Sequence, residues 1–341
     1  MPTPTRTLRR ATITGLGMYV PERILTNREL ETLVETSDQW IVDRTGIRER
    51  RIASEDQATS DLAIPAAQEA LRVANLSATD LDLIIVATCT GDMGSFPATA
   101  AIVQDRLEAK QAAAFDVVAV CSGFVYALDV AAQYIETGRY SNVLVIGAEI
   151  MSRLLDWTDR NTCVLFGDGA GAVVVQAAEE AADEGILGSI LGTDGSGVWL
   201  LNVPSGGTRS PLTPDRIADR QQYMTMRGKE VYRFAVEIMG EAAVQALGAV
   251  GLQPSDVDLF IPHQANTRII TAAAKRLDLP MEKVFVNVDR YGNTSAASVP
   301  LAMVEAWKMG KIQPGNLLVT VGFGAGLTWG ANVIRWGNVT P

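Results

Sequence analysis

The sequence is poor in histidine, cysteine and long apolar runs, and each shortage excludes a class of protein. Its 341 residues include one histidine, so any mechanism that needs two is excluded. The three cysteines are far apart and lack the CxxC spacing of zinc sites: Cys89, Cys121 and Cys163. Because they fit no disulfide framework either, we expect a reducing, cytoplasmic location and no metal.

Basic residues are also too few for some partners. A net charge of -10 argues against nonspecific nucleic-acid binding, which needs a basic face, although a local basic patch remains compatible with it. No apolar run approaches the roughly eighteen residues of a membrane span, so no membrane association is expected. The basic N-terminal stretch, 1–17, lacks the apolar core of a secretory signal.

Strand-like and helix-like segments alternate along the chain, as in α/β folds. Strands are predicted over 80–89, 113–120 and 142–149, and helices over 95–107 and 122–138. Gly138 is a typical stop signal for the second helix. With 48% hydrophobic residues, the chain can build a large core or two fused halves.

The second half of the chain resembles the first. TDLDLIIV (79–86) is similar to SDVDLFIP (255–262). A second match superposes Gly138 on Gly310, and the same offset carries Cys121 to Asn293. These two residues are therefore predicted at equivalent strand-to-helix junctions, which a duplicated unit would bring to one pseudo-twofold centre.

We accordingly expect two pseudo-symmetric halves, residues 1–180 and residues 181–341. The second half begins with a segment rich in Gly, Pro, Ser and Thr, 196–216. A loop of this length is either a functional cover or a linker between the halves, and composition alone leaves both open.

Cys121 lies between an apolar strand and a helix, in AVCSGFVYAL. Free N–H groups and the positive dipole end of a helix stabilise a thiolate, so we expect a lowered thiol pKa. The neighbouring Gly123 permits close approach of substrate or chain. Taken alone, however, a cysteine that ends an apolar strand is more often a core-packing residue.

His263 and Asn293 have ordinary explanations when each is considered alone. His263 follows a predicted strand, at the edge where open α/β sheets place active sites, but a lone histidine is commonly a satisfied core or surface residue. Asn293 is a typical helix cap or turn residue. Together with Cys121 they form a set in which an imidazole N–H and an amide N–H donate to one developing oxyanion. Because asparagine does not titrate, the pair suits an enolate better than a proton relay.

The motifs around these residues resemble those of β-ketoacyl-acyl-carrier-protein synthase III, of the thiolase superfamily. They run in order from about residue 9 to the C-terminus: GMYVPERILTN, SDQWIVDRTGIRERR, AVCSGFVYAL, FGDGAGAVVV, IPHQANTRII, YGNTSAASVPLA and GFGAGLTWG. The cysteine motif with HQAN and GNTSAAS is specific, whereas the glycine-rich pieces alone are not. The resemblance implies a five-layered αβαβα, thiolase-like fold, a homodimer, and no cofactor besides the CoA thioester substrate.

The resemblance also implies a decarboxylating Claisen condensation that initiates fatty acid synthesis from acyl-CoA and malonyl-acyl carrier protein. Cys121 would take the acyl group, and His263 and Asn293 would bind the malonyl thioester carbonyl. Loss of CO2 would supply the carbanion, so that no strong base is needed. The oxyanion hole would use the N–H of Cys121 and one from GFGAG, where Ala325 replaces a usual glycine and must keep an allowed φ.

Further binding residues carry over by motif. They are Trp40, Arg44 and Arg160 at the adenine end of CoA, Asn266 and Gly228 along the pantetheine arm, Phe323 against the malonyl carboxylate, and Phe96 as a limit on primer length across the dimer. Without the resemblance, surface, salt-bridge and packing roles would be preferred for all of them.

A basic patch would suit the carrier protein. Arg268, Lys275 and Arg276 share one face of the predicted helix after HQAN, and Arg233 is a further candidate. Such a patch would steer an acidic carrier protein onto an acidic enzyme. A solvated helix face explains the same pattern.

Several other functions use part of this residue set. A related acyltransferase or a polyketide-priming ketosynthase would keep the same three residues, and a cysteine hydrolase would admit water to the acyl-cysteine. A thiolase needs a second cysteine in the C-terminal glycine-rich loop, and an elongating synthase needs two histidines. A dinucleotide fold is disfavoured because GFGAG and GDGAG lead into predicted strands. Ser122 and the segment 89–97 depart from the family pattern and leave the primer open.

Overall fold

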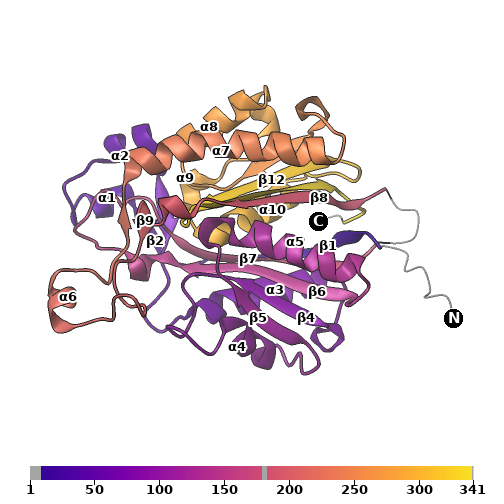
Figure 1. Cartoon of the computed structure of the whole chain (residues 1–341), viewed down its shortest axis with the longest axis horizontal. Helices are drawn as coiled ribbons and strands as arrows, with labels where there is room; N and C mark the ends of the chain where they lie inside the picture. Colours follow the sequence, from indigo (N-terminus) through magenta and orange to yellow (C-terminus); the bar gives the residue numbers. More distant parts are fainter. Residues whose placement is uncertain (1–8, 179–182, 340) are drawn as a thin grey trace.

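Two β-sheets lie face to face in the computed structural model, which describes residues 9–178, 183–339 and 341 (Figure 1). The first sheet has the strand order β1-β7-β6-β4-β5 and the second the order β11-β12-β13-β8. The strands of the first sheet are β1 (Ala11–Tyr19), β4 (Leu83–Ala87), β5 (Ala113–Val117), β6 (Asn142–Ile150) and β7 (Asp168–Ala177). Those of the second are β8 (Gly185–Thr193), β11 (Leu259–Pro262), β12 (Leu317–Gly324) and β13 (Thr328–Arg335).

Helices form the other three layers. Between the sheets lie α5 (Gly123–Glu136) and α10 (Ser298–Lys308); α3 (Thr59–Val73) and α4 (Thr99–Arg106) cover the first sheet, and α7 (Gly228–Ala249) and α8 (Thr267–Arg276) cover the second (Figure 1). The two central helices are apolar on most sides because each is buried against both sheets. The predicted αβαβα architecture is confirmed.

Shorter elements connect these layers. They are β2 (Ile24–Thr26), α1 (Asn27–Leu30), α2 (Asp38–Thr45), β3 (Glu49–Arg51), β9 (Leu201–Asn202), α6 (Pro214–Ala218), β10 (Thr225–Met226) and α9 (Val288–Tyr291), with single 3-10 turns that include η2 (Val120–Ser122) and η7 (Ser295–Ala297). No helix within the described ranges is long and apolar enough to cross a membrane.

All five elements predicted in the first half are present, and their ends lie within four residues of the predicted ones. The predicted stop at Gly138 is confirmed by its left-handed φ of 64°, and Gly310 after α10 has a φ of 69°. GDGAG and GFGAG both lead into strands, β7 and β13, as expected.

The exact equivalence of Cys121 and Asn293 is wrong by one helical turn. The central helices have 14 and 11 residues, so superposing their C-terminal glycines does not superpose their starts. At the N-terminal ends, η2 corresponds to η7, so Cys121 matches Ala296. Asn293 lies just ahead of its turn, whereas Cys121 lies within its own.

The predicted boundary between residues 180 and 181 lies outside the described residues. The segment 196–216 contains β9 and the start of α6, and the chain around α6 extends away from the two sheets (Figure 1). Residues 201–203 of this segment instead line a cavity together with Cys121.

The close approach of β6 to η7 gives a test of the central packing. A Cβ on Gly147 would lie 2.3 Å from the carbonyl oxygen of Ala296, and backbone cannot yield as a flexible side chain does. We expect Gly147→Ala to lower the free energy of unfolding by about 1–3 kcal/mol in denaturant titrations. Gly195→Ala is the control, because nothing lies within 4 Å of its added Cβ. Equal effects of the two substitutions would contradict this packing.

Candidate active site

The nucleophile candidate Cys121 lies in η2, directly before α5. Val120 has a φ of 47°, an unusual conformation for a β-branched residue, and it turns the chain from β5 into the helix. Cys121 is 4% exposed, so the residue is reached from a cavity rather than from the surface.

The expected lowering of the Cys121 pKa is wrong. Burial raises the pKa of the thiol to about 12; the charge of Glu149 also raises it, whereas the Ser295 hydroxyl and the backbone N–H of Cys121 lower it. The thiol is therefore protonated at neutral pH, and any nucleophilic attack by its sulfur requires a neighbouring group to accept the proton.

His263 follows β11 and is 1% exposed. Its backbone N–H donates to the carbonyl of Val321 at 2.7 Å, and its Nδ1 lies 2.5 Å from Oγ of Ser298. Burial lowers the imidazole pKa to about 3, so the ring is neutral. The Phe323 ring packs edge-on against it, with centroids 5.3 Å apart.

Asn293 is held by three hydrogen bonds. Its backbone N–H donates to Leu165, its carbonyl accepts from Gly167, and its Oδ1 accepts the N–H of Ser295 at 2.8 Å. Because Oδ1 is engaged in this turn, the Nδ2 amide is the group left to donate to a ligand. Cys121, His263 and Asn293 line one cavity of about 110 Å³, together with Phe323 and Gly324.

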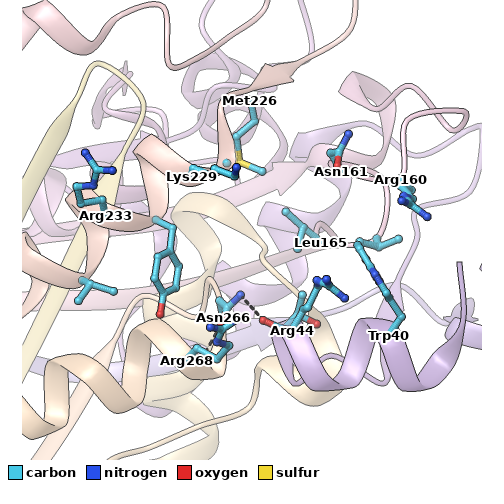
Figure 2. Close-up of a pocket in the computed structure, with 15 residues that line it drawn as sticks. Trp40, Arg44, Arg160, Asn161, Leu165, Met226, Lys229, Arg233, Asn266 and Arg268 are labelled. Atoms are coloured by element: carbon cyan, nitrogen blue, oxygen red, sulfur yellow. Dashed lines mark hydrogen bonds between the residues drawn. The ribbon is translucent and has the colours of Figure 1, made fainter.

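A larger cavity of about 970 Å³ adjoins this one (Figure 2). All five residues predicted for the nucleotide and pantetheine line it: Trp40, Arg44, Arg160, Gly228 and Asn266. Gly228 and Asn266 also line the smaller cavity, so the two are continuous. The guanidinium carbons of Arg44 and Arg160 lie 4.4 and 5.3 Å from the ring centroid of Trp40.

Asn266 has a structural role beside any contact with a ligand. Its Oδ1 caps α8 by accepting from the N–H of Arg268, and its Nδ2 donates to the carbonyl of Arg44 at 2.9 Å (Figure 2). Asn266 therefore acts as a helix cap whether or not it binds a ligand. Its bond to Arg44 also joins the N-terminal end of α8 to α2.

The residues predicted for carrier-protein docking fall into two groups, one that lines the larger cavity and one that does not. Arg233 and Arg268 line the larger cavity (Figure 2), where they are joined by a cation that the sequence did not single out, Lys229. Arg276 pairs with Glu241 of α7 at 3.0 Å, and Lys275 is exposed. The cavity mouth is thus basic on an acidic chain.

A third cavity, of about 130 Å³, also has Cys121 in its lining. It is lined by Cys89, Leu154, Phe166, residues 201–203 and Ala325. Ala325 is not among the residues with positive φ, so it keeps the allowed backbone conformation expected for an alanine in this loop. The neighbouring Gly326 has a φ of 140°. Phe96 is 84% exposed and lines none of these three cavities.

Some site residues were not predicted from the sequence. Ser298, which fixes the His263 ring, is the last serine of GNTSAAS, and its position within that motif was the available signal. Glu149 is buried near Cys121 and stands out as the only acid in the apolar strand β6. In the described part of the chain, no group of three or more His, Cys, Asp or Glu side chains is arranged to hold a metal ion.

Comparison with known proteins agrees with this geometry. The family model "3-Oxoacyl-[acyl-carrier-protein (ACP)] synthase III" matches residues 115–195, and the C-terminal model of the same enzyme matches residues 247–336. The chain is 56% identical to the β-ketoacyl-[acyl-carrier-protein] synthase III of Caldanaerobacter subterraneus over 96% of this chain and 98% of that one. The chain belongs to the β-ketoacyl-acyl-carrier-protein synthase III family.

Solved structures of this family share the fold throughout. The 3-oxoacyl-[acyl-carrier-protein] synthase III of Aquifex aeolicus is 49% identical with a TM-score of 0.89, covering 96% of this chain and all of that one, 100%. The enzyme of Pseudomonas aeruginosa is 43% identical with a TM-score of 0.90, covering 98% and 100%. The predicted family, its condensing acyltransferase class and its fold are therefore confirmed.

Proposed function

We propose that this enzyme moves an acyl group from acyl-CoA to Cys121 and condenses it with malonyl-acyl carrier protein, initiating fatty acid synthesis. One observation carries the proposal: Cys121, His263 and Asn293 line a single cavity that opens into the larger one beside Trp40. A thioester can therefore enter by its acyl end while the nucleotide stays at the basic mouth.

Two neutral donors stabilise the enolate in this scheme. We assign the Ser298 hydroxyl as donor to Nδ1 of His263, which leaves the proton on Nε2 for the malonyl thioester carbonyl. Nδ2 of Asn293 is the second donor, since Oδ1 is engaged by Ser295. Both act on the oxygen where charge develops as CO2 leaves.

Apolar surroundings favour loss of the carboxylate. Phe323 lines the cavity next to His263 and presents an apolar face to the malonyl carboxylate, which is destabilised without water or a cation. The backbone N–H groups of Cys121 and Ala325 complete the oxyanion hole for attack on the acyl-cysteine. No cofactor beyond the two substrates takes part in these steps.

The basic mouth serves the two substrates in turn. Arg44 and Arg160 meet the phosphate groups of CoA, and Arg233 and Arg268, extended by Lys275 and Arg276, steer the carrier protein. The enzyme works as a cytoplasmic homodimer of two-half subunits, in which the exposed Phe96 reaches the partner's third cavity and limits primer length.

The test is a product assay with a panel of acyl-CoA primers. We expect CO2 release and a β-ketoacyl-carrier product that both require malonyl-acyl carrier protein. A product that forms without CO2 release would favour the acyltransferase alternative. Consumption of acyl-CoA to free acid alone would favour a hydrolase.

Stacking on Trp40 gives a prediction specific to the nucleotide. We expect Trp40→Ala to raise the KM for acyl-CoA about tenfold, because stacking on a base contributes about 1–3 kcal/mol. An acyl thioester of N-acetylcysteamine, which has no nucleotide, should be used equally by both proteins. If Trp40→Ala raised the KM of both substrates alike, the tryptophan would support the site rather than the adenine.

A further inference from the structure

A buried carboxylate beside the nucleophile has no role in the steps above. Glu149, near the end of β6, is 0% exposed, and no ion pair among the described residues includes it. Its oxygens accept hydrogen bonds from the backbone N–H groups of Cys89 and Thr90 and from the side chains of Thr88, Cys89, Thr90 and Ser295. A carboxylate buried without a cation is costly, and these donors stabilise its charged form.

Ser295 connects this carboxylate to the nucleophile. Its hydroxyl donates to Oε1 of Glu149 at 3.0 Å. The Ser295 hydroxyl lowers the pKa of Cys121 and the charge of Glu149 raises it, so both groups lie close to the thiol. Since η7 packs against both η2 and β6, the hydroxyl lies on the element that adjoins the elements of the thiol and the carboxylate.

We propose that Glu149, acting through the Ser295 hydroxyl, accepts the proton of Cys121 during acylation. The Cys121 S–H bond breaks as sulfur attacks the acyl carbonyl; the proton passes to Ser295 Oγ, and the Ser295 proton passes to Glu149 Oε1. A carbon–sulfur bond forms to Cys121, and the bond to the CoA sulfur breaks. The CoA thiolate leaves with the electron pair and takes a proton from solvent. This inference rests on the proposed acylation of Cys121.

The stored proton returns in the second step. When the enolate attacks the acyl-cysteine, the bond to Cys121 sulfur breaks, and the leaving thiolate recovers the proton through Ser295. One solvent proton is consumed overall, by CoA, as replacement of a charged carboxylate by neutral CO2 requires. Between the two steps Glu149 is neutral, which suits a site where burial raises its pKa.

His263 is unsuited to the same task. Its Nδ1 faces Ser298, and burial lowers its pKa to about 3, so the neutral ring does not take up a second proton at neutral pH. The titratable groups that face Glu149 are the thiols of Cys89 and Cys121. Carboxylates on the elements packed against β6 are bonded elsewhere: Asp61 to Arg106, Glu69 to Lys308, Asp129 to Ser189, Glu136 to Gln133, Asp168 to Ser152 and Glu305 to Arg290.

The experiment follows Cys121 by two reactions across about pH 5 to 10. One is acylation by acetyl-CoA and the other is alkylation by iodoacetamide, both assigned to Cys121 by peptide mass. The variants are Glu149→Gln, Ser295→Ala and the double variant. Asp168→Asn is the matched control, because Asp168 is also a fully buried carboxylate but bonds to Ala53 and Ser152.

We expect Glu149→Gln to slow acylation about a hundredfold at neutral pH. In the wild-type enzyme the rate falls at low pH as Glu149 takes up a proton, above the ordinary range of a glutamate. This fall in the acylation rate at low pH should be missing in Glu149→Gln. The difference in rate between the variant and the wild-type enzyme should narrow at alkaline pH, where the thiol ionises without the help of Glu149. Ser295→Ala should slow acylation by the same factor, and the double variant should be no slower than either single variant. Asp168→Asn should keep the wild-type dependence of the acylation rate on pH.

Other results of this experiment would overturn the inference. A Glu149→Gln enzyme that acylates at the wild-type rate, or slowly with the fall at low pH retained, would overturn the inference. Should this variant fail to fold, a wild-type rate in Ser295→Ala would do the same. If acetyl-CoA acylates no variant, the proposed function fails, and iodoacetamide alkylation alone decides: dependence on Glu149 supports the inference and independence overturns it.

Discussion

Cys121→Ala is expected to lose both the acyl adduct and condensation, by at least about a thousandfold, because no other thiol occupies the shared cavity. The loss should appear in kcat of condensation and in the mass of the protein after mixing with acyl-CoA. It follows from the position of Cys121 in η2, where it lines both of the smaller cavities.

The control for this loss is a cysteine that is buried away from the cavities. Cys163→Ala removes a thiol of 0% exposure in the core, and it should retain the adduct and most of the activity. Full condensation by Cys121→Ala would mean that another group carries the acyl chain, and Cys89, which lines the third cavity, would be the first to test.

His263→Ala and Asn293→Ala are expected to separate the two half-reactions. Each should lower CO2 release from malonyl-acyl carrier protein by about a hundredfold to a thousandfold, the loss typical of one oxyanion donor. Acylation of Cys121 should be largely retained, since neither residue accepts its proton. Labelled malonyl substrate measures decarboxylation, and protein mass measures acylation.

Asn293→Asp sharpens this test because the carboxylate keeps the oxygen that accepts the Ser295 N–H but removes the N–H2 group. It should release CO2 as poorly as the alanine variant. Equal loss of acylation and decarboxylation in all three variants would contradict the separate roles of nucleophile and donors.

Sequence reasoning predicted those parts of the site that local pattern encodes. Apolar runs and Gly138 located the elements of the first sheet, and the resemblance placed Trp40 and Asn266 at what the structure shows to be one cavity. The sequence comparison paired Cys121 with Asn293 because it superposed the glycines that follow the two central helices. Since α10 is shorter than α5, this superposition does not bring the starts of the two helices together.

Contacts between distant segments were beyond the sequence. Glu149 and Ser295 are 146 residues apart, and nothing local indicates that a carboxylate in an apolar strand meets a hydroxyl in the other half. The thiol pKa was misjudged for a similar reason: the helix terminus is local, but it is outweighed by burial, and η2 packs against β12 and β13 of the other half.

The most direct test of the account is the mass of the intact enzyme, first with acyl-CoA and then with malonyl-acyl carrier protein. The account predicts one acyl adduct on Cys121 that persists in buffer and is discharged by malonyl-acyl carrier protein, with CO2 and a β-ketoacyl-carrier product. An adduct that the malonyl partner cannot discharge, or one that water removes equally fast, would contradict it.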